Sequence, residues 1–440
     1  MKMKTLYTTI FGIFFLLLGS GALKAQEPAM IPPPENEDTI GNAIRVLQGD
    51  VAVLKRVKFS GYIQAQYQQI DSAGAKSFAG GDFPAGVNKR FKVRRGEFKT
   101  MYDNGKTQIV ANIDITQSGV NIKDCYGKFT EQWLQTFSVT AGIFNRPFGW
   151  EIPTSASAIG SPERSRVNQT LFPGERDLGV MLTFQLPVTS KLRPLKLEAG
   201  LFNGNANNSK EDYDFQKDFI SHLTWVTSTK SENMSYGLGV SFYNGGVQNT
   251  NKFVYSDLLT MGTDSVKWVV DSSSTNKGAI SKRQYIGFDA QFSMKSIAGI
   301  TTIRAEYVMG MQPGSSSDSK SPNGQTATPA AADTYVRNMN GLTFYFSQNI
   351  ASTKHQLIFK YDWYDPNTGV EGLAIGKPGS KLTSADIKYT TIGLGWIYNW
   401  DNNVKIIAYY DIVKNEKTSL NGYKKDLLDN VFTARIQYKF

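Results

Sequence analysis

The chain has 440 residues, of which 40% are hydrophobic and 20% are charged, and its formal net charge is +10. Beyond the N-terminus it has no run of about 20 apolar residues, which excludes a helical membrane protein, and its 12% aromatic content argues against disorder throughout. With one cysteine, Cys125, and two histidines, we expect no internal disulfide, no metal site and no cofactor.

Residues 1–25 have the layout of a bacterial secretory signal peptide. Two lysines precede a short apolar run, Ile10–Leu18, and small residues follow it. Cleavage is expected after Ala25, with Ala22 as the alternative. The apolar run is too short for a membrane anchor, so the mature protein is predicted to be exported.

Residues 26–58 form a second region, predicted to lie in the periplasm. Its first part is rich in proline and is expected to be an extended spacer. Apolar residues then recur at steps of four and three, which predicts a short heptad helix: Ile40, Ile44, Leu47, Val51 and Leu54. A helix this short needs a partner. Either it folds back on the rest of the chain, or it joins subunits in a coiled coil.

From residue 59 to residue 440 the hydrophobic period is two, which is the signal of half-buried strands. In Thr107–Gln117, apolar and polar residues alternate without a break. Sixteen such segments are predicted, and they begin near Phe59, Arg90, Thr107, Asn121, Phe137, Leu178, Leu195, Phe219, Ser235, Gln284, Ile300, Asn338, Lys354, Lys388, Val404 and Asn430. Most approach the roughly 9–11 residues with which a tilted strand crosses a bilayer.

Short and long links alternate along these segments. Links such as Asp103–Lys106 and Trp400–Asn403 are short, whereas Gly245–Arg283 and Met311–Arg337 are long. In an up-and-down barrel this alternation places the short turns at one rim and the long loops at the other, as in bacterial outer-membrane barrels. A soluble β-sandwich would not need this asymmetry.

The fold class predicted is therefore all-β: a 16-stranded antiparallel transmembrane β-barrel with short periplasmic turns, long outer loops and a short N-terminal periplasmic helix. Aromatic residues near the strand ends are consistent with interfacial girdles. The last strand runs to Phe440. Such an ending resembles the segment that the bacterial barrel assembly machinery recognises, so we expect that machinery to be a partner through Phe440.

Several motifs then resemble one family. They are Arg90–Arg95, Ile122–Tyr126, Ala141–Phe144, Arg146–Glu151, Glu163–Ser165 and Leu171–Met181. These segments look like the phosphate-selective porin O and P family, in a form similar to its Bacteroidetes members. The resemblance implies a trimeric 16-stranded outer-membrane porin whose third outer loop folds into the lumen. It also implies that basic lumen residues draw in phosphate or polyphosphate.

The predicted solute path is basic but not uniformly so. Strand parity turns Arg304, Lys360 and Arg435 inward, and it also turns inward several acids, namely Asp114, Glu306, Asp362 and Asp411. The parity of Arg94 and Arg95 is ambiguous: Phe91 and Val93 indicate that odd positions face lipid, whereas Phe98 and Tyr102 indicate even ones, which suggests a bulge between Val93 and Phe98. The residues predicted to line the path are Arg94, Arg95, Arg146, Arg164, Arg166, Arg176, Arg304, Lys360 and Arg435.

The long loop Asn145–Asp177 supplies four of these arginines and an equal number of acids. The resemblance places this loop inside the channel, where it is predicted to narrow the pore with Arg164 and Arg166 nearest the solute. Two interpretations stay open: the arginines bind passing anions, or they fix the loop through ion pairs. A mixed lumen weakens the expectation of phosphate selectivity in particular.

The sequence thus predicts an outer-membrane porin for passive diffusion of small hydrophilic solutes, favouring anions such as phosphate. The alternative is an outer-membrane binding or adhesion barrel whose lumen is plugged by loops. A barrel enzyme needs a Ser/His/acid or paired-acid site, which the sequence does not supply. Expected partners are outer-membrane lipids, lipopolysaccharide, small anions and further copies of the chain in a homotrimer, with no nucleic acid.

Overall fold

The computed structural model describes residues 39–206, 211–212, 214–261, 265–320 and 332–440. The predicted signal peptide and the predicted Pro-rich spacer lie outside them. Sixteen antiparallel strands form a closed barrel. They are β1 (Val57–Ile70), β2 (Lys89–Asp103), β3 (Thr107–Thr116), β4 (Gly119–Thr130), β5 (Phe137–Asn145), β6 (Arg176–Gln185), β7 (Leu195–Phe202), β8 (Asp218–Ser228), β9 (Met234–Gln248), β12 (Ile280–Ser296), β13 (Gly299–Gly314), β14 (Thr334–Asn349), β15 (His355–Asp365), β16 (Tyr389–Asn399), β17 (Val404–Asn415) and β18 (Val431–Lys439).

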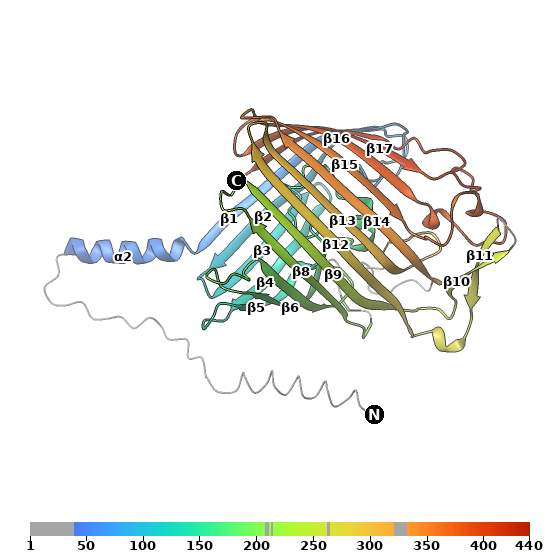
Figure 1. Cartoon of the computed structure of the whole chain (residues 1–440), viewed down its shortest axis with the longest axis horizontal. Coiled ribbons are helices and arrows are strands. Elements are labelled where there is room, and N and C mark those ends of the chain that lie inside the picture. Colours follow the sequence, from blue (N-terminus) through green and yellow to red (C-terminus); the bar gives the residue numbers. More distant parts are fainter. Residues whose placement is uncertain (1–38, 207–210, 213, 262–264, 321–331) are drawn as a thin grey trace, which may run out of the picture. The chain divides into compact units, whose positions relative to one another are not determined.

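Each strand pairs with its neighbour in the chain, and the first strand pairs with the last. β1 meets β18 from Tyr62↔Lys439 to Ile70↔Val431, so no barrel edge is left open. Figure 1 shows the strands running obliquely around the barrel. Closure satisfies the backbone hydrogen bonds that hydrocarbon cannot satisfy. The prediction of a 16-stranded barrel is therefore confirmed.

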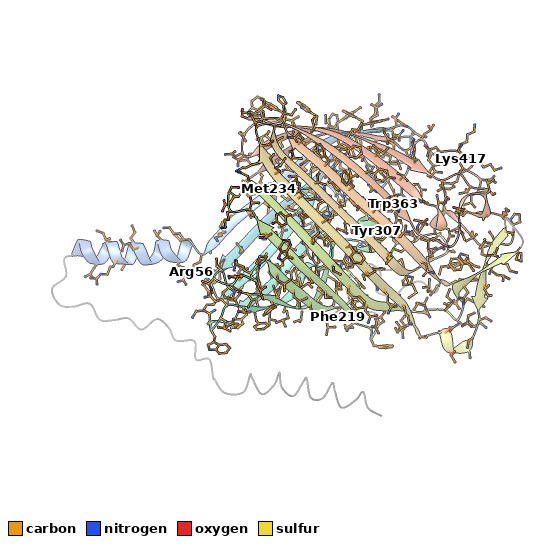
Figure 2. All side chains as sticks on the ribbon, viewed as in Figure 1. Arg56, Phe219, Met234, Tyr307, Trp363 and Lys417 are labelled. Carbon is orange, nitrogen blue, oxygen red and sulfur yellow. The ribbon has the colours of Figure 1, made fainter. Side chains whose placement is uncertain are left out.

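The alternation along the strands separates an apolar outer surface from a polar lumen. In β15, Lys360 and Asp362 are buried inside the barrel, whereas Leu357 on the other face is 46% exposed. Figure 2 shows side chains projecting along the strands, with Phe219, Tyr307 and Trp363 among them. The period of two in the sequence thus corresponds to the two faces of the barrel wall.

One long link contains structure that the sequence analysis did not predict. Within the predicted loop Gly245–Arg283, β10 (Val254–Met261) and β11 (Ser265–Asp271) form an antiparallel hairpin. Two residues of β10 also pair in parallel with the start of β14, and Tyr255 stacks on Tyr335 with ring centroids 4.3 Å apart. The hairpin therefore extends the barrel wall beyond the rim that carries the long loops (Figure 1).

Helix α2 (Thr39–Leu54) covers the predicted heptads. Ile44, Leu47, Val51 and Leu54 are all exposed, by between 40% and 69%. An exposed apolar stripe on a short helix is consistent with both alternatives from the sequence, packing against the rest of the chain or a coiled coil between subunits. Within the described part of the chain, no helix is both long and apolar enough to span a membrane.

Candidate channel constriction

Residues 146–175, here called the inward loop, connect β5 to β6 and pack against the inside of the barrel wall. The apolar side of this loop contributes Phe148, Ile152, Val167, Leu171 and Phe172 to a buried cluster. The wall contributes Ile220, Tyr243, Tyr285, Val308 and Met339, which come from β8, β9, β12, β13 and β14. Burial of this apolar surface fixes the loop against this side of the barrel wall.

Two wall glycines let the loop approach closely. A Cβ atom at Gly287 would lie 2.7 Å from Phe148 Cζ, and one at Gly341 would lie 2.8 Å from a methyl carbon of Val167. Real side-chain carbons do not approach that closely, so glycine is required at both places for this packing.

A buried carboxylate organises the middle of the loop. Glu151 accepts hydrogen bonds from the backbone and hydroxyl of Ser165, and Tyr345 Oη donates to its Oε1 over 3.0 Å. Ser165 is also the N-cap of the short helix α3 (Arg166–Leu171). From the wall, Glu306 Oε2 accepts the backbone N–H groups of Trp150 and Glu151 at 3.0 and 3.1 Å. These bonds fix the loop backbone to β13 and β14.

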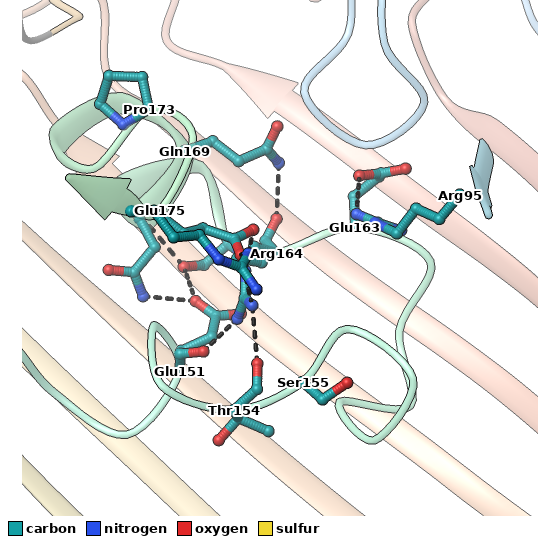
Figure 3. Close-up of polar contacts among 12 residues, drawn as sticks. Arg95, Glu151, Thr154, Ser155, Glu163, Arg164, Gln169, Pro173 and Glu175 are labelled. Atoms are coloured by element: carbon teal, nitrogen blue, oxygen red, sulfur yellow. Dashed lines mark hydrogen bonds and ion pairs between the residues drawn. The ribbon is translucent and has the colours of Figure 1, made fainter. Parts of the chain in front are cut away.

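Arginines close the loop upon itself. Arg164 donates two hydrogen bonds to Glu175, at 2.6 and 3.0 Å, and donates to the backbone carbonyls of Glu151 and Thr154 (Figure 3). Arg176 bridges Glu175 and Asp124. Burial alone would raise the pKa of Glu175, but Arg164 and Arg176 outweigh that effect and hold the pKa well below its usual range.

The polar tip of the loop reaches the opposite wall. Glu163 accepts two hydrogen bonds from Arg94, at 2.6 and 2.7 Å, and one from Arg95 at 3.2 Å, while Arg435 Nη2 lies 3.8 Å from Glu163 Oε1. Figure 3 shows the carboxylate of Glu163 turned toward Arg95. Burial favours a raised pKa for Glu163, but Arg94 and Arg95 outweigh it and hold the pKa far below its usual range. Three guanidinium groups thus surround one carboxylate.

Two β-bulges explain the surplus of positive charge on this wall. In the pairing of β1 with β2, Gln64 is opposite Arg95 and Ala65 is opposite Val93, which leaves Arg94 as the extra residue. The bulge lets consecutive arginines both reach Glu163, so the bulge predicted near them is confirmed.

A second bulge lies on β4. Asn112 of β3 is opposite Asp124 and Ile113 is opposite Ile122, which leaves Lys123 as the extra residue. Arg94 and Lys123 line the same cavity. Among the residues that the structure describes, Lys123 forms no ion pair within 4 Å. The sequence analysis did not select Lys123, because the alternation of strand faces does not predict which way the extra residue of a bulge points.

Two cavities lie on opposite sides of the inward loop. One, here called the outer cavity, has a volume of about 790 Å³ and reaches the long outer loops through Ser77 and Asp318. It is lined by Arg94, Arg95, Lys123, Glu163 and Lys320. The other, of about 1110 Å³, reaches the short turns through Val188 and Ser228 and is lined by Lys196 and Glu198. The loop therefore divides the lumen, as a constriction does.

The remaining predicted path residues are engaged by the protein. Arg146 donates to the carbonyls of Pro173 and Glu175. Arg166 stacks on Phe78 and Tyr389, with its guanidinium carbon 4.3 and 3.4 Å from the ring centroids. Arg304 and Lys360 belong to the barrel wall. Arg304 lies over the ring of Trp150, 5.2 Å from its centroid. Lys360 Nζ lies 3.5 Å from a carboxylate oxygen of Asp362 and 3.5 Å from one of Asp411.

The predicted path residues thus separate into those that line the outer cavity and those that do not. Arg94, Arg95 and Arg164 line the outer cavity, whereas Arg166 is absent from its lining. All four hydrogen-bonding contacts of Arg164 go to protein acceptors. This geometry favours the interpretation in which the arginine fixes the loop. The role of each residue in solute passage stays a prediction.

Comparison with known proteins agrees with this architecture. The solved structures that are similar include the outer-membrane channel DcaP of Acinetobacter baumannii, at 12% identity and a TM-score of 0.50, and OmpF of Salmonella typhi, at 11% identity and a TM-score of 0.52. Each match covers 87% of this chain and 97% of the other. An anion-selective porin from Comamonas acidovorans matches at 12% identity and a TM-score of 0.49, over 87% of this chain and 99% of that one.

At these identities the likeness shows the fold alone. A comparison with curated proteins returned no match. The family model for phosphate-selective porin O and P matches residues 79–440, which span β2 to β18 and include the inward loop and both bulges. The chain therefore belongs to the phosphate-selective porin O and P family, and it is an outer-membrane β-barrel porin.

Proposed function

We propose that this porin lets small hydrophilic solutes diffuse passively and favours anions, phosphate among them. The observation that carries the proposal is the cluster of cations on the wall of the outer cavity. Arg94, Arg95 and Lys123 lie there together, and Lys123 forms no ion pair within 4 Å among the described residues. A cation facing a narrow water-filled space raises the local concentration of anions.

The balance of charges around the tip of the loop also favours anions. The tip of the loop sets three guanidinium groups, those of Arg94, Arg95 and Arg435, against the single carboxylate of Glu163. The nearby Glu97 and Asp114 accept from Tyr62 Oη and the Gly96 N–H, and their negative charges offset part of this positive charge. Guanidinium groups pair well with oxyanions, because their donors match two acceptor oxygens.

Conductance in planar bilayers separates this proposal from a binding or adhesion barrel with a plugged lumen. The purified full-length protein should insert with discrete, voltage-independent current steps in KCl. Folded protein that gives no steps would favour the plugged barrel.

A catalytic role has less support. His222 does contact an acid, since its Nε2 lies 2.8 Å from Asp289 Oδ2, a pairing that the sequence analysis did not predict. The cross-strand neighbour Ser241 is fully buried, and its hydroxyl accepts from the Gly149 N–H. A serine so placed is not available as a nucleophile, and family and fold point to a channel.

We also propose a homotrimer within the outer membrane. The exposed apolar stripe of α2, which includes Leu47 and Val51, suits a coiled coil between subunits. The apolar outer surface of the barrel suits contact with membrane lipids and lipopolysaccharide, and Phe440 suits recognition by the barrel assembly machinery. Crosslinking of the folded protein in detergent tests the trimer.

A further inference from the structure

The contacts of Glu163 are those that a bound oxyanion would make. Its two oxygens accept from Nε and Nη2 of Arg94, one on each oxygen, and Arg95 adds a third donor. Carboxylates and phosphates share this two-oxygen recognition by a guanidinium group. The position that a solute anion would occupy is therefore filled by a side chain of the protein.

Two of the three basic side chains around Glu163, those of Arg95 and Arg435, are also held by other partners. Arg95 Nη1 donates to Gln64 Oε1 and to the carbonyl of Pro162, at 3.0 and 3.3 Å. Arg435 Nε donates to Gln66 Oε1 at 2.8 Å. Both guanidinium groups are buried, and these other partners are neutral, so they would not compensate the charge of the arginines if Glu163 were removed. Removal of Glu163 would thus leave a preorganised cationic site.

The loop is also held in place without Glu163. Its apolar side is buried against β8, β9 and β12–β14, Glu151 bonds to Tyr345 of the wall, and Arg164 closes the loop onto Glu175. None of these contacts includes Glu163. The carboxylate at the tip therefore has a role that the fixing of the loop does not require.

We propose that Glu163 is a resident anion occupying an oxyanion-binding site formed by Arg94, Arg95 and Arg435. Its carboxylate competes with solute oxyanions such as phosphate and so limits how tightly the channel holds them. Arg94, with 29% of its side chain exposed, lines the outer cavity together with Glu163, so a solute can reach the site. The inference rests on the proposed anion-conducting function and names the residue that sets its selectivity.

The test is inhibition of chloride current by inorganic phosphate in planar bilayers. Glu163→Gln keeps the shape and one acceptor oxygen but removes the charge. It should lower the phosphate concentration for half-inhibition by about tenfold, equivalent to about 1.4 kcal/mol. It should also shift the reversal potential in a KCl gradient further toward anions.

The matched control is Glu198→Gln, which removes the same charge from the lumen. Glu198 lies in the cavity on the side of the short turns and pairs with Lys196 Nζ at 2.9 Å. It should leave phosphate inhibition within about twofold of wild type, because it does not touch the arginine site. An equal gain in both glutamine variants would overturn the proposal, since general charge would then explain it.

A second variant keeps the test decisive if Glu163→Gln folds poorly. Glu163→Asp withdraws the carboxylate by one methylene and should strengthen phosphate inhibition by a smaller factor. Wild-type phosphate inhibition in whichever of the two variants conducts would disprove the resident anion while leaving the channel intact. Wild-type protein without any conductance would instead reject the proposed function itself.

Discussion

Arg164 and Glu175 join the two ends of the inward loop, with the Nε–Oε1 and Nη2–Oε2 distances at 2.6 and 3.0 Å. Arg164 is 5% exposed and also donates to the carbonyls of Glu151 and Thr154. A guanidinium group with its donors in use offers little net attraction to a passing anion. The Arg164–Glu175 pair therefore stabilises the shape of the constriction.

Arg164→Ala should destabilise the folded barrel by about 1.5–3 kcal/mol, because Glu175 keeps only its bond from Arg176 and two carbonyls lose their donor. Urea unfolding followed by the heat-modifiable gel shift measures the loss. The control is Lys217→Ala, which removes a more exposed pair with Asp212 and should cost about 1 kcal/mol or less. Equal losses in the two variants would show that the Arg164 pair contributes no more than a surface pair.

Lys123→Gln should move the reversal potential in a KCl gradient toward cations more than Arg164→Gln does. Both substitutions remove one positive charge that lines the outer cavity, but no ion pair of Lys123 is found among the described residues, whereas Arg164 has Glu175. Lys354→Gln is the control for charge alone, since its Nζ donates to the Trp400 carbonyl at the turn rim. A larger shift with Arg164→Gln would contradict the assignment of roles.

Acid should progressively weaken the attachment of the loop below about pH 4. The pKa values of Glu163 and Glu175 are depressed below those of an unfolded chain, where glutamate titrates near 4.3. Their stabilising effect is therefore complete above that value and is lost as the pH falls toward the folded pKa. Single-channel current should be steady between about pH 5 and 8 and become noisy only well below about pH 4. Noise that sets in near neutral pH would point to other groups.

The fold was predictable because a barrel wall has a simple period. Every segment from Phe59 to Phe440 had to turn alternate residues to lipid and water, and all sixteen strands were found in order. The hairpin β10–β11 was missed, because it lies in a loop and buries Tyr255 and Trp268 against other loops. Such contacts between distant segments leave no periodic signal.

The site was less predictable, because it depends on breaks in that period. Arg94 and Lys123 are the extra residues of two bulges, so parity alone placed neither. The loop arginines were identified, but their partners depend on a three-dimensional path. Nothing in the sequence shows that Arg164 meets Glu175 while Glu163 crosses to Arg94.

Leu47→Asp combined with Val51→Asp should lower the temperature at which the oligomer dissociates, if α2 joins subunits. Both side chains are exposed in the single chain, so the variant should still fold, whereas a charge buried in an apolar seam is costly. Semi-native gel migration across a temperature series measures the effect. An unchanged dissociation temperature would leave the helix as a spacer and place the trimer contacts on the barrel.

A cysteine at Ser317 should react with an impermeant maleimide on intact cells, and a cysteine at Asn104 should not. Ser317 lies in the long link after β13, and Asn104 lies in the short turn between β2 and β3. The experiment uses a Cys125→Ser background, because Cys125 is exposed. Labelling at residue 104 with none at residue 317 would mean that the barrel has the opposite orientation in the membrane.

The reversal potential of the wild-type channel in a tenfold KCl gradient tests the central claim most directly. The excess of guanidinium and ammonium groups over carboxylates at the tip of the inward loop predicts that chloride carries most of the current. The potential should therefore have the sign of an anion-selective pore. A potential of the opposite sign, from a pore with normal conductance, would contradict the account.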